Sequence, residues 1–177
     1  KNDLPESTSI HFHGVDLPFS QDGVPFISQP PIRPGETYEY EFTIVDVPGT
    51  FMYHSHHNAE QQVDKGLFGT FIVEGEKNWD VEFTLVTGDG SHGYTLNGKG
   101  FPATAPIVVK KDQKVLVRIL NDGQMLHPMH LHGVDFQVVA QDGKSVTPYT
   151  RDTLTVAPGE RYDILFTASK EGVWPFH

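Results

Sequence analysis

The feature of this sequence that most constrains its fold is an internal repeat between its two halves. Three pairs of segments match in the same order along the chain: His11–Asp16 with His130–Asp135, Arg33–Thr43 with Ala157–Thr167, and Gly49–His54 with Gly172–His177. Two copies of one structural unit are the natural explanation of such self-similarity. We therefore expect two domains, residues 1–75 and residues 78–177, joined near residues 75–78.

Strand-forming runs and turn signals alternate along the chain. It holds 17 glycines and 13 prolines at short intervals, and no long helical periodicity lies between them. β-Branched and aromatic residues favour strands in five runs: Tyr38–Ile44, Ile107–Val109, Val115–Leu120, Phe136–Val139 and Tyr162–Phe166. The sequence therefore predicts an all-β fold with antiparallel sheets, a sandwich or a barrel.

Laying one half over the other predicts that both copies are truncated. The second copy has about fifty residues before His130, whereas the first has only ten before His11. The second copy also stops at His177, opposite His54, so nothing matches the run Leu67–Val73. We expect N-terminal strands to be missing from domain 1 and a C-terminal strand from domain 2.

Composition excludes several classes of partner. The formal net charge is -10 and no run of lysine or arginine occurs, which argues against nucleic acid and against anionic membrane surfaces. No apolar run approaches the roughly 18 residues that a membrane span needs. The chain has no cysteine, so it offers neither a disulfide nor a thiolate ligand.

Histidines provide the clearest chemical signal. Six of the 10 histidines form three pairs with one residue between them: His11 with His13, His54 with His56, and His130 with His132. Chance would give only about half of one such pair. Side chains two apart on a strand point to one face, roughly 6.8 Å apart, so each pair can bind one metal ion or two neighbouring ions. His127, followed by a proline, is a candidate ligand for a different site.

Four histidine segments occur in a specific order: H-F-H-G at 11–14, H-S-H at 54–56, H-P-M-H-L-H-G at 127–133 and W-P-F-H at 174–177. With these segments the sequence resembles the multicopper oxidases, laccase-like enzymes built from cupredoxin domains. The likeness spans nearly the whole chain, and two units make it most similar to the two-domain bacterial laccases. The resemblance implies two tandem Greek-key β-sandwich domains of the cupredoxin kind.

The resemblance also implies copper as cofactor, with up to four ions per protomer in the full-length protein. It assigns His11 and His130 to a type 2 copper and His127 to a type 1 blue copper. It assigns five further histidines to a binuclear type 3 centre: His13, His54, His56, His132 and His177. Family members continue with a cysteine ligand after the last of these, so we expect a chain ending there to be inactive toward phenols.

By resemblance, the activity is one-electron oxidation of phenolic or aromatic donors, or of metal ions, coupled to four-electron reduction of O2 to water. Domain 1 supplies four histidines and domain 2 three, so their shared cluster is expected at a domain interface. In the two-domain group that interface lies between the subunits of a homotrimer. The resemblance also implies a periplasmic or extracellular location, although residues 1–4 do not look like a signal peptide.

Two other classes of function remain open from the residues. Because a cysteine ligand is missing, a non-enzymatic copper-binding cupredoxin protein is the first alternative. The second is a bicupin-type metal dioxygenase, because Glu60 follows His54 and His56 in the order of a cupin metal motif. That reading leaves His11, His13 and His127 unexplained.

An acid is needed because reduction of O2 to two waters consumes four protons. Asp22 lies nine residues after His13 and resembles the acidic residue that the family has beside its copper cluster. We therefore predict Asp22 as the catalytic proton donor, although an aspartate before glycine is also typical of a turn. Asp16, matched by Asp135 in the second copy, is the rival candidate.

Overall fold

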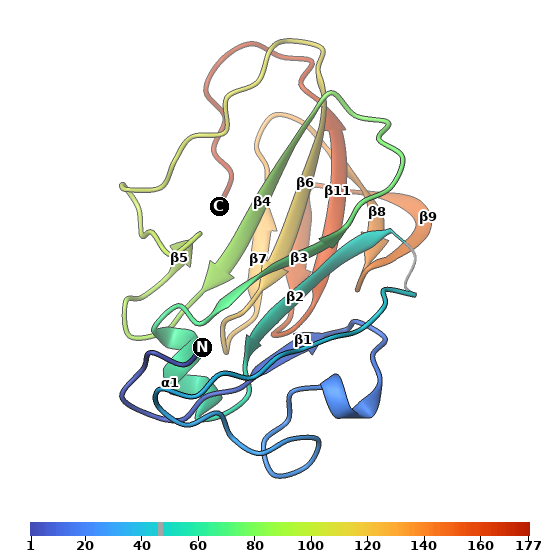
Figure 1. Cartoon of the computed structure of the whole chain (residues 1–177). Helices are drawn as coiled ribbons and strands as arrows, with labels where there is room; N and C mark the ends of the chain where they lie inside the picture. Colours follow the sequence, from blue (N-terminus) through green and yellow to red (C-terminus); the bar gives the residue numbers. More distant parts are fainter. Residues whose placement is uncertain (46–47) are drawn as a thin grey trace. The chain divides into compact units, whose positions relative to one another are not determined.

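The computed structural model describes residues 1–45 and 48–177 (Figure 1). By its internal contacts the chain divides into two compact units. Unit 1 comprises Lys1–Val47 with Phe51–Val73, and unit 2 comprises Pro48–Thr50 with Glu74–His177. No helix among the described residues is long and apolar enough to cross a membrane. The domain boundaries at residues 75 and 78 stay predictions.

Unit 1 is built on a three-stranded sheet in the order β1-β2-β3, in which β1 and β2 run antiparallel. Its strands are β1 (Ile10–His13), β2 (Gly49–Ser55), whose first two residues belong to unit 2, and β3 (Phe68–Val73). A short 3-10 helix, η1 (Phe19–Gln21), and one short α-helix, α1 (Ala59–Asp64), lie in its connections. β1 and β2 pair so that His11 is opposite His54.

The predicted strand at Tyr38–Ile44 is wrong, but the burial of its side chains alternates as predicted up to Thr43. Tyr38, Tyr40 and Phe42 are half-buried, while the residues between them are exposed. The rings of Tyr40 and Phe42 pack edge-on against Phe12, at 5.4 and 4.9 Å between centroids. A strand also needs a backbone partner, and no strand among the described residues pairs with this segment.

Unit 2 holds a six-stranded sheet in the order β5-β4-β6-β11-β8-β9 and a two-stranded sheet, β10-β7. The bounds of its strands are β4 (Val81–Gly88), β5 (Thr95–Leu96), β6 (Lys114–Asn121), β7 (His127–His130), β8 (Phe136–Gln141), β9 (Lys144–Arg151), β10 (Thr153–Val156) and β11 (Arg161–Thr167). β6 is buried from Val115 to Asn121, as a central strand covered on both faces should be. The all-β prediction is confirmed, and so are the predicted strands at 115–120, 136–139 and 162–166.

Two expectations for unit 2 are wrong. The sheet is not purely antiparallel, because β4 and β6 run parallel from Val81 opposite Val115. Their connection, residues 89–113, is long enough to return the chain to the same end of the sheet, as a parallel pair requires. Ile107–Val109 is extended but unpaired. Its Ile107 and Val109 side chains pack on the core, while Val108 is exposed.

The repeat predicted from the sequence recurs in the backbone of both units. The Asn2 N–H donates to the Glu36 carbonyl at 2.8 Å, and the Asn121 N–H donates to the Glu160 carbonyl at 3.1 Å. Each asparagine side chain also donates two hydrogen bonds to backbone carbonyls of its own unit. The segments 2–11 and 121–130 are therefore equivalent positions of one structural plan.

Candidate metal centre

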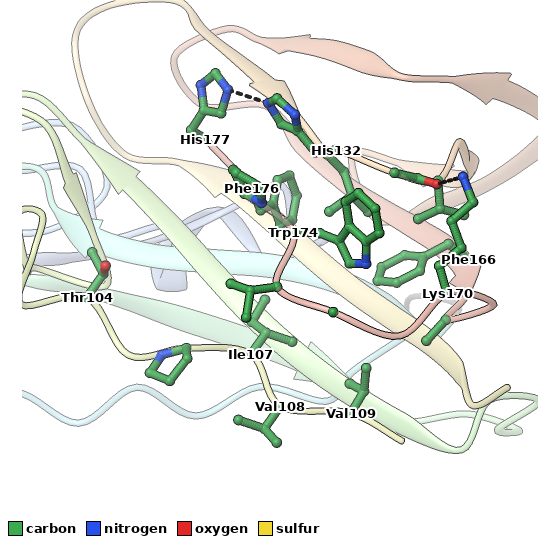
Figure 2. Close-up of a pocket in the computed structure, with 18 of the residues that line it drawn as sticks. Thr104, Ile107, Val108, Val109, His132, Phe166, Lys170, Trp174, Phe176 and His177 are labelled. Carbon is green, nitrogen blue, oxygen red and sulfur yellow. Dashed lines mark hydrogen bonds between the residues drawn. The ribbon is translucent and has the colours of Figure 1, made fainter. Parts of the chain in front are cut away.

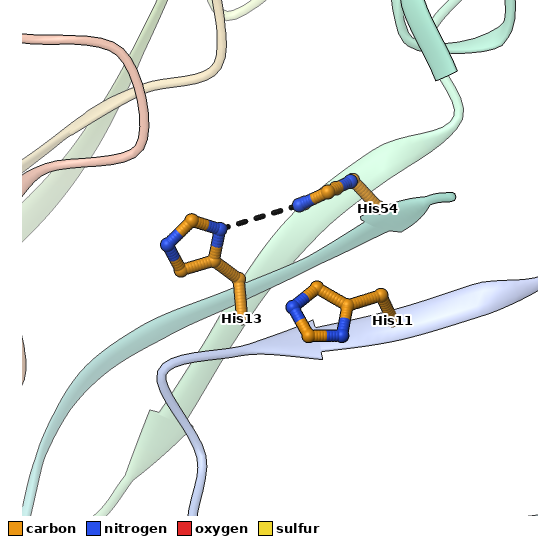
Figure 3. A group of neighbouring side chains, drawn as sticks. All are labelled: His11, His13 and His54. Atoms are coloured by element: carbon orange, nitrogen blue, oxygen red, sulfur yellow. Dashed lines mark hydrogen bonds between the residues drawn. The ribbon is translucent and has the colours of Figure 1, made fainter. Parts of the chain in front are cut away.

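In unit 1 the strand pairing brings three histidines together (Figure 3). The ligand nitrogens of His11, His13 and His54 all lie within 4.8 Å of one another. His13 Nδ1 is 3.3 Å from His54 Nε2, and the two rings point toward each other. Two nitrogens each about 2.0 Å from one ion at a tetrahedral angle would be about 3.3 Å apart, so this pair already has the spacing of two ligands of one ion. The His56 ring lies next to His11, at 5.3 Å between centroids.

In two of these rings, a backbone carbonyl determines which nitrogen is free to bind a metal ion. His11 Nδ1 is 2.7 Å from the Asp22 carbonyl, and His54 Nδ1 is 2.9 Å from the Ser55 carbonyl. A carbonyl only accepts, so Nδ1 carries the hydrogen in both rings and Nε2 keeps its lone pair. Such partners orient ligand histidines in metal sites generally.

The protonation state of His54 also favours metal binding. Burial lowers the pKa of His54, and the neighbouring His11 and His56 lower it further, although the hydrogen bond to Ser55 opposes them. A neutral imidazole is the form that binds metal. Imidazole suits copper, zinc, iron and nickel, so the donor set fits copper.

In unit 2 a second trio forms from His130, His132 and His177. The ring centroids are 4.7 Å apart for His130 and His132 and 5.2 Å apart for His132 and His177. His132 Nε2 lies 3.1 Å from His177 Nε2 (Figure 2). His130 Nδ1 donates to the Asp152 carbonyl at 2.7 Å, the same arrangement that His11 has with Asp22. Among the described residues, however, only the unit 1 trio has all its ligand nitrogens within 4.8 Å.

His127 lies apart from that trio, at the other end of β7 from His130, about 10 Å along the strand. Its Nε2 is 2.7 Å from Asp89 Oδ2, and both side chains are buried. Asp89 also accepts hydrogen bonds from the Gln124 and Met125 N–H groups, each at 2.9 Å. Burial alone would raise the pKa of Asp89, but these hydrogen bonds outweigh it and hold the pKa below its usual range. An ionised Asp89 makes Nε2 the protonated nitrogen and leaves Nδ1 of His127 as the ligand atom.

Asp22, the predicted proton donor, lies at the edge of the unit 1 trio. It follows η1, and its Oδ1 is 3.4 Å from His11 Nδ1 with the side chain 39% exposed. Asp16 and Asp135 are exposed. The structure brings Asp22 to the site, but its catalytic role and the assignment of each histidine to one copper stay predictions.

A cavity of about 910 Å³ opens beside His132 and His177 in unit 2. Figure 2 shows apolar side chains lining it, among them Phe166, Trp174 and Phe176. This volume lies within the range of small-molecule sites. His132 and His177 therefore border a large, mainly apolar space.

The sequence did not predict the roles of Asp89 or of the three backbone carbonyls that orient histidines, those of Asp22, Ser55 and Asp152. Asp89 is 38 residues from His127, so no local spacing connects them. Every residue has a backbone carbonyl, so the residue types do not reveal which carbonyls will contact a histidine. The cupin alternative fails because Glu60 lies exposed on α1, outside the histidine trio of unit 1.

Comparison with known proteins agrees with this geometry. Residues 1–78 and residues 78–177 each match a multicopper oxidase family model. Laccase-1 of Botryotinia fuckeliana is 33% identical over 92% of this chain and 34% of its own length. The iron transport multicopper oxidase of Candida albicans is 31% identical over 91% of this chain and 30% of its own length. The chain thus spans about a third of the length of these curated relatives.

A solved structure extends the comparison. The blue copper oxidase from Nitrosomonas europaea superposes with a TM-score of 0.94 at 31% identity, covering 100% of this chain and 64% of that one. Its likeness confirms the cupredoxin-like β-sandwich fold predicted from the sequence. From the two family matches, the histidine spacing and this superposition, we conclude that the chain belongs to the multicopper oxidase family.

Proposed function

We propose that this protein is a laccase-like, copper-dependent oxidase. It takes single electrons from phenolic or aromatic-amine donors, or from metal ions, and couples four of them with four protons to the reduction of O2 to two waters. The convergence of His11, His13 and His54, with two ring tautomers fixed by backbone carbonyls, is the observation that carries the proposal. Bound copper would supply the one-electron redox chemistry.

The ligand assignment follows the repeat. His11 and His130 each hold Nδ1 on the carbonyl of an aspartate, which supports one shared role at a type 2 copper. The type 3 ligands would be His13, His54, His56, His132 and His177. His127 would bind the type 1 copper through Nδ1, with Asp89 holding the opposite nitrogen.

Protons would come from Asp22. Its carboxyl is exposed enough to exchange protons with solvent and lies 3.4 Å from His11 Nδ1. Its role would be to hold a proton on a carboxylate oxygen beside the oxygen-reducing site and to take another from water after each transfer.

The oligomeric state of the protein is also a proposal. Each unit carries part of the trinuclear ligand set, so we propose that the sets combine between the subunits of a homotrimer. We also propose that the protein is located in the periplasm or outside the cell. Sedimentation should report a trimer, and a copper-loaded, active monomer would contradict this part.

Oxygen uptake tests the activity. The copper-loaded full-length protein should hold near three or four coppers per protomer and consume O2 with a phenolic donor without releasing peroxide. The zinc-loaded protein is the control, because zinc has no redox chemistry. Stable copper without oxygen uptake would favour the alternative, a non-enzymatic copper-binding cupredoxin protein.

A further inference from the structure

Gln62 is a fully buried polar residue on α1, beside the strand that carries His54. Its amide oxygen accepts hydrogen bonds from Ser55 Oγ at 2.6 Å and Thr8 Oγ1 at 2.8 Å. Its amide nitrogen donates to the Ser7 carbonyl at 2.8 Å. The Gln62 side chain therefore joins three segments of unit 1: its own helix α1, the end of β2, and the segment at residues 7–8.

The orientation of this amide is determined by its partners. The Ser7 carbonyl can only accept, so the nitrogen must face it, and the oxygen must face the two hydroxyls. Those two hydroxyls occupy both lone pairs of the amide oxygen. Buried networks that are satisfied in this way are rigid, and a lost partner is costly.

The two hydroxyls belong to the segments that carry the histidines. Ser55 lies between His54 and His56 and is itself fully buried. Because side chains alternate along a strand, Ser55 points away from the face of the two rings and toward Gln62. Thr8 lies just before β1, which carries His11 and His13. Gln62 thus links the backbone segments that hold the four candidate ligand histidines of unit 1.

The repeat shows how unit 1 differs here from unit 2. When segment 2–11 is laid over segment 121–130, Thr8 occupies the position of His127. In unit 2 that position carries a histidine bonded to Asp89. In unit 1 it carries a hydroxyl bonded to Gln62.

We infer that Gln62 is a positioning residue for the metal-binding histidines of unit 1. Its amide accepts a hydrogen bond from Thr8, which occupies the repeat position that unit 2 gives to a candidate ligand. Through its second bond, from Ser55, the same amide holds β2 in place against the segment leading into β1. The nitrogens of His11, His13 and His54 are thereby preorganised for the proposed copper cluster. This inference rests on the proposed function, because it presupposes that these histidines bind metal.

Zinc binding read at individual histidines tests the inference. Zn²⁺ is diamagnetic and binds imidazole, so the ¹⁵N shifts of the His54 and His11 rings report its occupancy in the full chain. Gln62→Leu should raise the dissociation constant about 10- to 100-fold, as loss of a partner that orients ligands does. The matched control is Gln61→Leu, because Gln61 is the exposed neighbour on the same helix and should leave the dissociation constant unchanged.

A double-mutant cycle separates positioning from general stability. Ser55→Ala should also weaken zinc binding, and adding Gln62→Leu to it should weaken binding by less than the product of the two single effects. All titrations are made well below the unfolding temperature of each variant. Should Gln62→Leu not fold, Ser55→Ala and Thr8→Val decide the question.

Two contrary results are distinguishable. Variants that are folded and bind zinc as the parent does would overturn the inference while leaving the metal site intact. A parent whose His11, His13 and His54 shifts do not respond to Zn²⁺ or Cu²⁺ would overturn the proposed function, and the inference with it.

Discussion

His130 and His177 exchange both of their backbone hydrogen bonds, at 2.6 and 3.0 Å between nitrogen and oxygen. In unit 1, His11 lies opposite His54 in the same kind of cross-strand pair. Each unit therefore sets a histidine of its H-x-H segment directly against a histidine from a later segment. Backbone pairing therefore determines which histidines face each other in each unit.

Removal of one ring from the unit 1 trio should abolish tight copper binding there. His54→Ala leaves two of three converging nitrogens, so we expect Cu²⁺ affinity at this site to fall at least about 100-fold, roughly 3 kcal/mol. Isothermal titration measures it. His92→Ala is the control, because His92 is exposed and outside the trio, and equal affinity in both variants would argue against the site.

Asp89→Asn should disturb His127. Asp89 accepts three hydrogen bonds, and an asparagine would turn its NH2 group toward one of these donors. We expect a loss of about 1–3 kcal/mol in the free energy of unfolding and a mixture of His127 tautomers. Urea unfolding and ¹⁵N ring shifts measure the two effects. Asp135→Asn, at an exposed position, is the control, and an unchanged His127 tautomer would contradict the assignment of Nδ1 as ligand atom.

Asp22→Asn should separate copper binding from oxygen turnover. The Asp22 carbonyl, which orients His11, is retained in this variant, so copper content should not change. Oxygen uptake by the full-length protein should fall by at least about tenfold, with a larger solvent isotope effect, because general acid catalysis contributes about 10²–10⁴-fold. Asp16→Asn should have no such effect. Turnover at the parental rate across the pH range would show that Asp22 is only a turn residue.

Stability should depend on pH through Asp122. Burial raises its pKa to about 7 from the usual 3.8, and its Oδ2 has no hydrogen-bond partner among the described residues. The unfolded chain loses this proton near pH 4 while the folded chain keeps it to about pH 7, so the carboxyl lowers stability progressively as pH rises between them.

The Asp122→Asn variant removes that dependence. Relative to the parent, its free energy of unfolding should rise by about 1–4 kcal/mol between pH 4 and pH 7. Asp112→Asn, at an exposed position, provides the control for urea unfolding across this range. Parallel pH profiles for parent and Asp122→Asn would contradict the raised pKa.

Spacing in the sequence predicted the features that depend on local periodicity. His11 and His13 reach one face because side chains alternate along β1, and Tyr38–Thr43 has the expected alternation of burial. Whether such a segment pairs depends on a neighbouring strand, which alternation does not reveal. The parallel pairing of β4 with β6 was missed for the same reason, since a period of two residues carries no strand direction.

The partners of the histidines could not be predicted from spacing. Asp89 reaches His127 across 38 residues, and Gln62 reaches Thr8 across 54. Both contacts form only when distant segments pack. Gln62 also looks like its neighbour Gln61 in sequence, and burial alone distinguishes them.

Copper K-edge absorption on the copper-loaded protein tests the central claim, that these histidines bind copper, most directly. We expect a first shell of nitrogen at about 2.0 Å with the outer-shell scattering pattern of imidazole, and this pattern should weaken in His54→Ala. A first shell of oxygen alone, or an imidazole signal unchanged by His54→Ala, would contradict it.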